Sequence, residues 1–152
     1  KKLYGVVSNM SIAVERRDFL KHFDCFICNQ LEAGMLFMED YADKSPEELR
    51  DILSKRVILG KIPAMIVTMG GNGAVYADVN GEKGICPPQR VRVKDTTGAG
   101  DAFCAGVASG LTYGKTLSEA VEIGSRLAAS VITSSENVCP RFLPEEFGIT
   151  LD

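Results

Sequence analysis

The stretch Asp95-Thr96-Thr97-Gly98-Ala99-Gly100-Asp101 leads from a predicted strand directly into a predicted helix that begins near Gly100. Gly98, Ala99 and Gly100 leave consecutive backbone N–H groups unshielded at the N-terminus of this helix. The helix macrodipole adds partial positive charge there, so an anion such as phosphate is stabilised. The helix continues with small residues, which allow close backbone packing and hold its N-terminus rigidly. The stretch therefore predicts a rigid, anion-binding turn between a strand and a helix.

Asp101 lies in the first turn of this helix. A carboxylate beside an anion site repels phosphate, so we interpret Asp101 as the acceptor for the proton of a hydroxyl that attacks phosphorus. The alternative is that Asp101 only caps a helix after a glycine-rich turn, which is the better interpretation of an isolated Gly-x-Gly-Asp.

Two other stretches match phosphate-binding motifs only in part. Residues 109–116 end like a P-loop, but Ser109 occupies the position of its first glycine. Residues 98–103 begin like a dinucleotide-binding fingerprint, but Phe103 stands where the third glycine is needed for helix packing. The sequence therefore disfavours a P-loop enzyme and a Rossmann dehydrogenase.

Helices and strands alternate along the chain, with turns at Asn80-Gly81 and around Pro87-Pro88. The predicted strands are Leu3–Val7, Asp24–Cys28, Ala64–Met69, Ala74–Val79, Glu82–Cys86 and Arg90–Val93. The predicted helices are Ile12–His22, Gln30–Met38, Ser45–Leu59, Gly100–Leu111 and Leu117–Thr133. This order indicates a layered α/β domain with parallel connections in its first half and an antiparallel meander in the middle.

The composition is that of a globular protein. The chain has 152 residues, of which 45% are hydrophobic and 24% are charged, which suits one domain or a piece of one. Its net charge is −3 and it has no long basic run, which argues against a dedicated nucleic-acid binder. No stretch approaches 18 uninterrupted apolar residues, so no membrane segment is predicted.

Cysteine and histidine usage narrows the possible chemistry further. The five cysteines form no spaced framework and are interpreted as reduced thiols of a cytoplasmic protein. Cys25 and Cys28 lie in a predicted strand, where residues three apart point to opposite faces and cannot share one zinc ion. The only histidine, His22, is expected at the solvated surface, which argues against a Ser/His/Asp hydrolase and a multi-histidine metal centre.

The stretch Asp95–Asp101, with the small residues up to Ala108, resembles the second signature of the ribokinase or PfkB family of carbohydrate and nucleoside kinases. That signature reads Asp-Thr-x-Gly-Ala-Gly-Asp, followed by a helix of small residues, and the match contains no departure. The resemblance implies transfer of a phosphoryl group from ATP, with Mg²⁺, to a hydroxyl of a sugar or nucleoside. It implies that Asp101 is the catalytic base and that the backbone of the three preceding residues is the anion hole.

A second part of the resemblance is Asn29-Gln30-Leu31-Glu32, at the end of a predicted strand. It is similar to the family's Asn-Glu-x-Glu element, which implies that Asn29 supports the nucleotide phosphates and Glu32 the hydrated Mg²⁺ ion. Gln30 replaces the middle acid, so one acidic group of the element is missing. The same four residues also suit an ordinary strand end followed by a helix cap.

A third part is the segment Val67–Ala74, which resembles the family's Thr-x-Gly-x-x-Gly nucleotide loop. The resemblance implies that ATP is contacted by the hydroxyl of Thr68 and by the exposed backbone amides near Gly70 and Gly73. Considered without the resemblance, the segment indicates only a tight hairpin.

The predicted helix from Ser125, with the residues that follow it, resembles the segment that covers adenine, so Ser125 is expected at the nucleotide. The resemblance implies that carbonyl groups of this segment and those near Asp95 and Thr97 hold a monovalent cation such as K⁺. Residues 133–140, together with the missing middle acid between Asn29 and Glu32, are more similar to the pseudouridine-kinase branch than to ribokinase or fructokinase. Pseudouridine, ribose, fructose and related furanoses therefore all stay open as acceptors.

The resemblance covers nearly the whole chain but only the C-terminal half of a family member. It implies that residues 1–152 are the nucleotide-binding and catalytic-base part of a three-layer ribokinase-like fold: an α/β fold with a mostly parallel sheet flanked by helices and an antiparallel meander. The N-terminal half, with its acceptor site and lid, is expected to be absent. We therefore expect the isolated chain to be inactive, and either to be poorly stable or to associate with a second copy through an exposed sheet edge.

Two classes of function follow from these observations. The first is an ATP-dependent sugar or nucleoside kinase, of which this chain supplies one half. The second is a non-catalytic remnant that binds nucleotide or serves as an assembly module. Asp101 occurs in the sequence under either hypothesis, so it does not discriminate between them.

Overall fold

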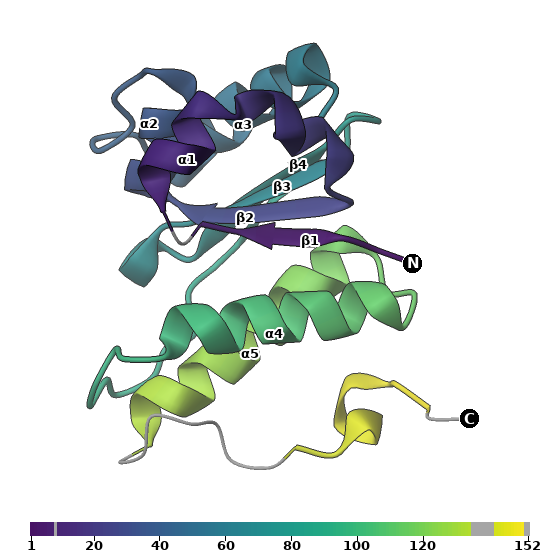
Figure 1. Ribbon diagram of the computed structural model, residues 1–152. Helices are drawn as coiled ribbons and strands as arrows, with labels where there is room; N and C mark the ends of the chain where they lie inside the picture. The colour runs from purple at the N-terminus through teal and green to yellow at the C-terminus, as the bar shows by residue number, and fades with distance from the viewer. Residues whose placement is uncertain (8, 135–141, 151–152) are drawn as a thin grey trace. The chain divides into compact units, whose positions relative to one another are not determined.

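The computed structural model of the chain describes residues 1–7, 9–134 and 142–150. The chain forms two compact units, Lys1–Pro88 and Gln89–Asp152, and each is described by itself. The first unit contains a five-stranded sheet and its covering helices, and the second contains a pair of long helices (Figure 1). The boundary follows Pro87-Pro88, where two residues without a backbone N–H end the last strand.

The sheet has the strand order β1-β2-β3-β4-β5. Its strands are β1 (Tyr4–Val6), β2 (Cys25–Asn29), β3 (Ala64–Thr68), β4 (Ala74–Asp78) and β5 (Lys83–Cys86). The pairs β1–β2 and β2–β3 are parallel, whereas β3–β4 and β4–β5 are antiparallel. The α/β fold class expected from the sequence, with parallel connections first and a meander afterwards, is confirmed.

Three helices of the first unit lie on the same face of the sheet: α1 (Met10–Glu15), α2 (Gln30–Phe37) and α3 (Pro46–Gly60) (Figure 1). The single helix expected over residues 12–22 is instead divided into α1 and a 3₁₀ helix, Arg17–His22. The division falls at Arg16, whose backbone leaves the helical region at φ −116° and ψ 36°. The Arg16 guanidinium lies over the Phe19 ring, 4.0 Å from its centroid, in the following turn.

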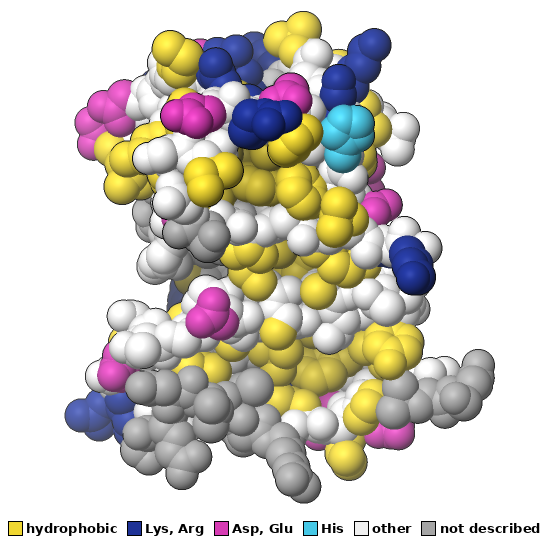
Figure 2. All heavy atoms as spheres, in the orientation of Figure 1, with side chains coloured by type: hydrophobic (Ala, Val, Ile, Leu, Met, Phe, Trp, Pro, Cys, Tyr) yellow, Lys and Arg dark blue, Asp and Glu magenta, His cyan; other side chains and the backbone are white. Residues whose placement is uncertain are grey.

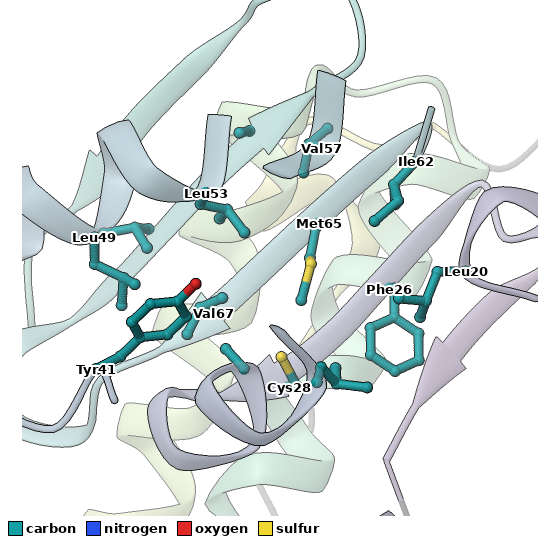
Figure 3. Packing of buried hydrophobic residues seen from close by; sticks show 14 of the residues in the cluster. Leu20, Phe26, Cys28, Tyr41, Leu49, Leu53, Val57, Ile62, Met65 and Val67 are labelled. Atoms are coloured by element: carbon teal, nitrogen blue, oxygen red, sulfur yellow. The ribbon is translucent and has the colours of Figure 1, made fainter. Parts of the chain in front are cut away.

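The core of this unit fills the space between the sheet and the helices. Met65 lies near its centre, with Leu49, Leu53 and Val57 of α3 around it and Phe26 of β2 beside it (Figure 3). Side chains of a strand alternate between its two faces, so every second residue of β2, β3 and β4 enters this core. The buried members from these strands are Phe26, Cys28, Met65, Val67, Val75 and Ala77.

The second unit is a helical hairpin of α4 (Ala99–Thr112) and α5 (Leu117–Thr133), followed by a 3₁₀ helix at Pro144–Phe147. The two long helices approach most closely at glycine. A Cβ atom on Gly106 would lie 2.7 Å from the Cα of Gly124, and one on Gly124 would lie 2.7 Å from the carbonyl oxygen of Phe103. The small residues of α4 therefore serve close backbone packing, as the sequence predicts.

One predicted strand is wrong. Residues 89–93 have no regular secondary structure, and Arg90, Val91, Arg92 and Val93 are all exposed. The alternation of Arg and Val imitates a half-buried strand, but the paired meander of the described residues ends with β5 at Cys86. A strand needs a hydrogen-bonding neighbour, and the two prolines that follow β5 interrupt the chain before one is reached.

The surface agrees with the expected charge pattern. His22 is exposed, as predicted, and is the one cyan side chain in Figure 2. On the face drawn there, basic and acidic side chains are interspersed over the helices of the first unit. None of the helices in the described part of the chain is both long and apolar enough to cross a membrane.

Candidate functional site

The turn before α4 has the geometry that its glycines allow. Gly98 is the N-cap residue and adopts a left-handed conformation, with φ 81° and ψ −6°, which glycine enters without steric cost. The Ala99 N–H donates to the carbonyl oxygen of Thr96 at 3.2 Å, which closes the turn, and Ala102 makes the first helical hydrogen bond to Gly98. No side chain caps this helix. The first-turn N–H groups are therefore left without a side-chain acceptor.

The acidic residue at the third position of each helix has no capping role in α4, unlike in α2, α3 and α5. In α2, α3 and α5 this position is Glu32, Glu48 and Glu119, and each glutamate forms a reciprocal capping box with the N-cap residue. Asp101 occupies the same position in α4, but its N-cap is glycine and no cap hydrogen bond is formed. The Asp101 carboxylate is exposed. Asp101 therefore lacks the hydrogen bonds of a helix-capping acid.

Gly100 has no local reason to be glycine. Its φ is not positive, and a Cβ atom on it would meet nothing within 4 Å. Glycine in a helix costs about 1 kcal/mol relative to alanine, so its presence is unfavourable for folding. Open space in front of this backbone leaves room for a ligand to approach the N–H groups.

Asp95 and Thr97 form a compact turn just before Gly98. One carboxylate oxygen of Asp95 accepts from the Thr97 backbone N–H at 2.9 Å and from the Thr97 hydroxyl at 2.8 Å. These hydrogen bonds hold the pKa of Asp95 below its usual range, and the bond from the Thr97 backbone N–H has the larger effect. The Lys94 N–H donates to the carbonyl oxygen of Ile132 at 2.7 Å, which attaches this turn to the end of α5.

Ser125 lies within α5, one residue after the close contact at Gly124, and is half-buried. The expected adenine-covering segment also includes residues 135–137, and the similarity to the pseudouridine-kinase branch extends to residue 140. These residues lie outside the part of the chain that the structure describes.

In the first unit, the expected nucleotide-binding residues gather at the carboxyl ends of two adjacent parallel strands. Asn29 ends β2 and Thr68 ends β3, and the two residues are direct partners in the parallel register. Ligands of open α/β sheets bind beyond the carboxyl ends of strands. The chain thus brings together two residues that are 39 positions apart in the sequence.

Asn29 and Glu32 are held by a capping box. The Asn29 side chain accepts from the Glu32 N–H at 2.9 Å, and the Glu32 Oε2 atom accepts from the Asn29 N–H at 2.8 Å. The spacing of the two residues therefore has a structural explanation as well as the functional one. Only Oε2 of the Glu32 carboxylate takes part in the box, so the other oxygen can accept from a metal-bound water. No three His, Cys, Asp or Glu side chains of the described residues cluster as a metal site.

Gly70 and Gly73 shape the turn between β3 and β4. Both have positive φ, 55° and 87°, and the Met69 N–H donates to the Gly73 carbonyl oxygen at 2.8 Å. A Cβ atom on Gly73 would collide with the carbonyl oxygen of Cys86, whereas one on Gly70 would meet nothing within 4 Å. Gly73 is thus required by packing against β5, and Gly70 combines a glycine conformation with open space.

The site residues expected from the sequence therefore form two groups, one in each unit. Asn29, Glu32, Thr68, Gly70 and Gly73 lie at one end of the sheet. Asp95, Thr97 and residues 98–101 form one continuous turn and helix start. One residue that sequence reasoning missed is Gln30, whose side chain binds carbonyl groups 11 to 14 residues away. No local sequence signal reveals that contact.

The mixed α/β sheet, with glycine-rich turns after β3 and before α4, has the fold of the ribokinase-like kinases. The family of pfkB carbohydrate kinases matches residues 4–140 of the sequence. The chain belongs to this family.

Three known proteins illustrate the relationship. Guanosine-inosine kinase of Exiguobacterium acetylicum is 38% identical over 138 residues, which are 89% of this chain and 44% of that protein. Pseudouridine kinase of Escherichia coli is 35% identical over 69 residues, 45% of this chain and 22% of that protein. The crystal structure of a probable sugar kinase from Rhizobium etli matches with a TM-score of 0.75 at 26% identity, covering 99% of this chain and 46% of that one. The chain spans less than half the length of each.

Proposed function

We propose that this chain is the nucleotide-binding and proton-accepting part of an ATP-dependent kinase that phosphorylates a hydroxyl of a nucleoside or a ribose-like sugar. The observation that carries the proposal is the start of α4, where an uncapped helix N-terminus stands beside an exposed, unpaired Asp101 carboxylate. The N–H groups stabilise negative charge, and the carboxylate supplies a base. Membership of the pfkB family supports the same reaction.

The residues around α4 divide two tasks in this proposal. The backbone N–H groups of Gly98, Ala99 and Gly100 stabilise the charge of the transferred phosphoryl group. Asp101 accepts the proton of the attacking hydroxyl, which raises the nucleophilicity of its oxygen. Because Asp101 makes no capping hydrogen bond, its carboxylate is available for that proton.

The residues at the end of the sheet serve the nucleotide. ATP is contacted by Thr68, Gly70 and Gly73. Asn29 supports the phosphates of ATP, and Glu32 binds a water of the hydrated Mg²⁺. Mg-ATP supplies the phosphoryl group and neutralises part of its charge when bound. Glu32 fits this task because one of its carboxylate oxygens lies outside the capping box.

A K⁺ ion beside Asp95 and Thr97, and contact of Ser125 with the nucleotide, complete the proposed site. The Asp95 carboxylate places a negative charge in this turn, which favours a cation. The attachment of the preceding residue, Lys94, to Ile132 supports a joint role of this turn and the end of α5. We place the activity in the cytoplasm, because the five cysteines of the sequence have no spaced pattern of a disulfide framework.

A purine nucleoside is the first candidate for the acceptor. The guanosine-inosine kinase is similar along 89% of the chain, whereas the pseudouridine kinase is similar along 45%. Pseudouridine therefore takes second place, and a sugar is the third candidate through the structure of the probable sugar kinase.

The proposal is tested by calorimetric titration of the chain with Mg-ATP and by a kinase assay. The assay compares guanosine, inosine, pseudouridine, ribose and fructose, with and without the N-terminal half of the Exiguobacterium acetylicum enzyme added in trans. We expect weak Mg-ATP binding and no useful turnover by the chain alone. Positioning of two reactants contributes roughly 7 kcal/mol or more to lowering a barrier, and the acceptor-binding part is needed for it.

The variant Asp101→Asn tests the assignment of the base in the complemented assay. The amide cannot accept a proton, so turnover should fall about a hundredfold or more while Mg-ATP affinity stays within a few-fold of the wild type. Glu122→Gln, at an exposed position of α5, is the charge-matched control and should keep full turnover. Near-normal turnover of Asp101→Asn would remove Asp101 from this role. Nucleotide binding without turnover under any complementation would indicate the non-catalytic remnant, and an absence of binding the assembly module.

A further inference from the structure

Gln30 is the first residue of α2 and lies between Asn29 and Glu32 in the sequence. Its Nε2 atom lies 2.6 Å from the carbonyl oxygen of Tyr41 and 3.3 Å from those of Ala42 and Lys44. Three carbonyl oxygens converge on the end of one side chain. Carbonyl oxygens accept hydrogen bonds only, so the group that faces them must be a donor.

The segment that Gln30 binds is itself firmly attached to α2. The Glu39 N–H donates to the Gly34 carbonyl oxygen at 2.9 Å, and a Cβ atom on Gly34 would lie 2.6 Å from the Glu39 carbonyl oxygen. Tyr41 is buried and donates from its hydroxyl to Glu39 Oε2 at 2.7 Å. Glu39 also forms an ion pair with Arg56 of α3. The segment 39–44 is therefore a fixed support between α2 and α3.

A glutamate at position 30 could not make these contacts with its side chain in the same place. Its carboxylate would face three carbonyl oxygens, with no proton to donate and no cation among the described contacts to bridge them. These three contacts therefore require a hydrogen-bond donor at position 30 of the Asn29–Glu32 stretch. The missing acid of the element is replaced by a hydrogen-bonding anchor.

We propose that Gln30 is a positioning residue: its amide fixes the N-terminal turn of α2 against residues 41–44 and thereby sets the direction of Asn29 and Glu32 toward the nucleotide and its Mg²⁺. This inference rests on the proposed function. Gln30 touches neither ligand in this arrangement, and it acts through the capping box that begins one residue before it. Outer residues that orient metal-binding groups change metal affinity by about 10-fold to 100-fold when they are removed.

The test is the Mg²⁺ dependence of ATP binding by the whole chain, measured by calorimetry well below the unfolding temperature. Gln30→Met keeps the length of the side chain but has no hydrogen-bond donor. Gln30→Glu replaces the donor by a carboxylate, which only accepts hydrogen bonds. We expect ATP affinity without Mg²⁺ to change little, and the gain in affinity on adding Mg²⁺ to fall about tenfold in Gln30→Met and further in Gln30→Glu. Tyr41→Phe is the matched control, because it weakens the same segment but keeps the Gln30 hydrogen bonds.

Several outcomes contradict the inference in different ways. If both Gln30 variants keep the wild-type gain on adding Mg²⁺ and only their thermal midpoints fall, Gln30 has a structural role and no positioning role. If Gln30→Glu binds Mg-ATP more tightly than the wild type, the side chain faces the metal and the inference is overturned. If Tyr41→Phe loses the gain in affinity on adding Mg²⁺ to the same extent, segment 39–44 and not the Gln30 amide determines this gain.

The wild-type chain separates the inference from the proposed function. If it binds ATP equally with and without Mg²⁺, the inference is overturned but nucleotide binding is left intact. If it does not bind ATP at all, the inference and the proposed function are both overturned.

Discussion

At the scale of single residues, the four long helices differ in what their third residue does. Three glutamates complete capping boxes, and their carboxylates stabilise the helices that carry them. Asp101 of α4 is left exposed after a glycine N-cap, and Gly100 beside it is required neither by conformation nor by packing. Gly100 costs helix stability, and the proposed ligand, which uses the N–H groups and the carboxylate, accounts for both features.

Replacement of Gly100 by valine should separate binding from folding. The new side chain points into open space, so the free energy of unfolding should stay the same or rise by up to about 1 kcal/mol. The same side chain obstructs the first-turn N–H groups, and loss of one hydrogen bond to a charged phosphate lowers Mg-ATP affinity about tenfold or more. Ser118→Val is the control, because Ser118 is exposed at the equivalent position of α5. Equal Mg-ATP affinities in both variants would exclude the anion hole.

A surface ion pair gives the first unit a pH dependence at low pH. Asp51 of α3 accepts hydrogen bonds from Arg50 Nε and from Lys83 Nζ of β5, each at 2.9 Å. The Arg50 hydrogen bond, followed by that of Lys83, lowers the pKa of Asp51 to about 2. A carboxyl group with a lowered pKa in the folded state stabilises the fold above its unfolded pKa, and this contribution disappears as the group is protonated.

The stabilisation by Asp51 should therefore be complete above about pH 4 and be lost between about pH 4 and pH 2. In thermal unfolding experiments, Asp51→Asn should melt below the wild type at pH 5 and approach it as the pH falls to 2. Asp43→Asn, at an exposed position outside this pair, should follow the wild-type pH dependence. A constant difference between Asp51→Asn and the wild type over this range would contradict the ion-pair explanation.

At the scale of elements, the hairpin of α4 and α5 depends on glycine for its helix spacing. Gly106 faces the backbone of Gly124, and Gly110 faces Ala120, where a Cβ atom on Gly110 would lie 3.0 Å from the Ala120 Cα. Backbone atoms at a helix crossing cannot move aside as a flexible side chain can. Close contact of this kind holds the N-terminal turn of α4 in one place.

Gly106→Ala should therefore destabilise the chain although alanine favours helices. The overpacking costs about 1–3 kcal/mol, and the higher helix propensity of alanine offsets at most about 1 kcal/mol of it. Urea unfolding measures the difference. Gly100→Ala, in the same helix but with open space around its Cβ atom, is the control and should be as stable as the wild type or more so. A Gly106→Ala variant that matches this control would show that the helices can move apart at no cost.

At the scale of the whole molecule, the first unit ends its sheet at an open strand. Within the described residues β1 pairs with β2 only, and Val6 is 51% exposed on it. An unpaired edge strand offers its backbone groups to another chain. This arrangement carries the proposal that the isolated chain associates through β1.

Light scattering over a range of concentrations should find a mass above that of the monomer. Val6→Lys should shift the equilibrium toward the monomer, because a charged side chain on an edge strand opposes pairing with a second strand. Leu59→Lys adds the same charge at an exposed apolar position of α3, away from the edge, and should leave the association unchanged. A monomeric wild type at all concentrations would exclude the edge as a self-association surface.

The sequence by itself determined those features whose signals lie within a few neighbouring residues. The α/β class follows from hydrophobic periodicity, the start of α3 from Ser45, Pro46 and Glu48, and the turn before α4 from its glycines. The resemblance to the family rests on residues 95–108, which match its second signature without a departure. The strand expected at residues 90–93 is wrong because the prediction used a local signal alone. Alternation of polar and apolar residues indicates a strand, but a strand also needs a neighbouring strand to pair with, and the local pattern does not supply one.

Only the tertiary structure decided the contacts between residues far apart in the chain. It paired Asn29 with Thr68 at one end of the sheet, packed Gly73 against Cys86, and joined the Gln30 amide to the carbonyl groups of residues 41–44. These contacts depend on strand register and helix placement, which arise from the packing of the whole core. Gln30 therefore looks like a lost acid in the sequence and is an anchor in the fold, because its acceptors are backbone atoms that the folded chain carries to it.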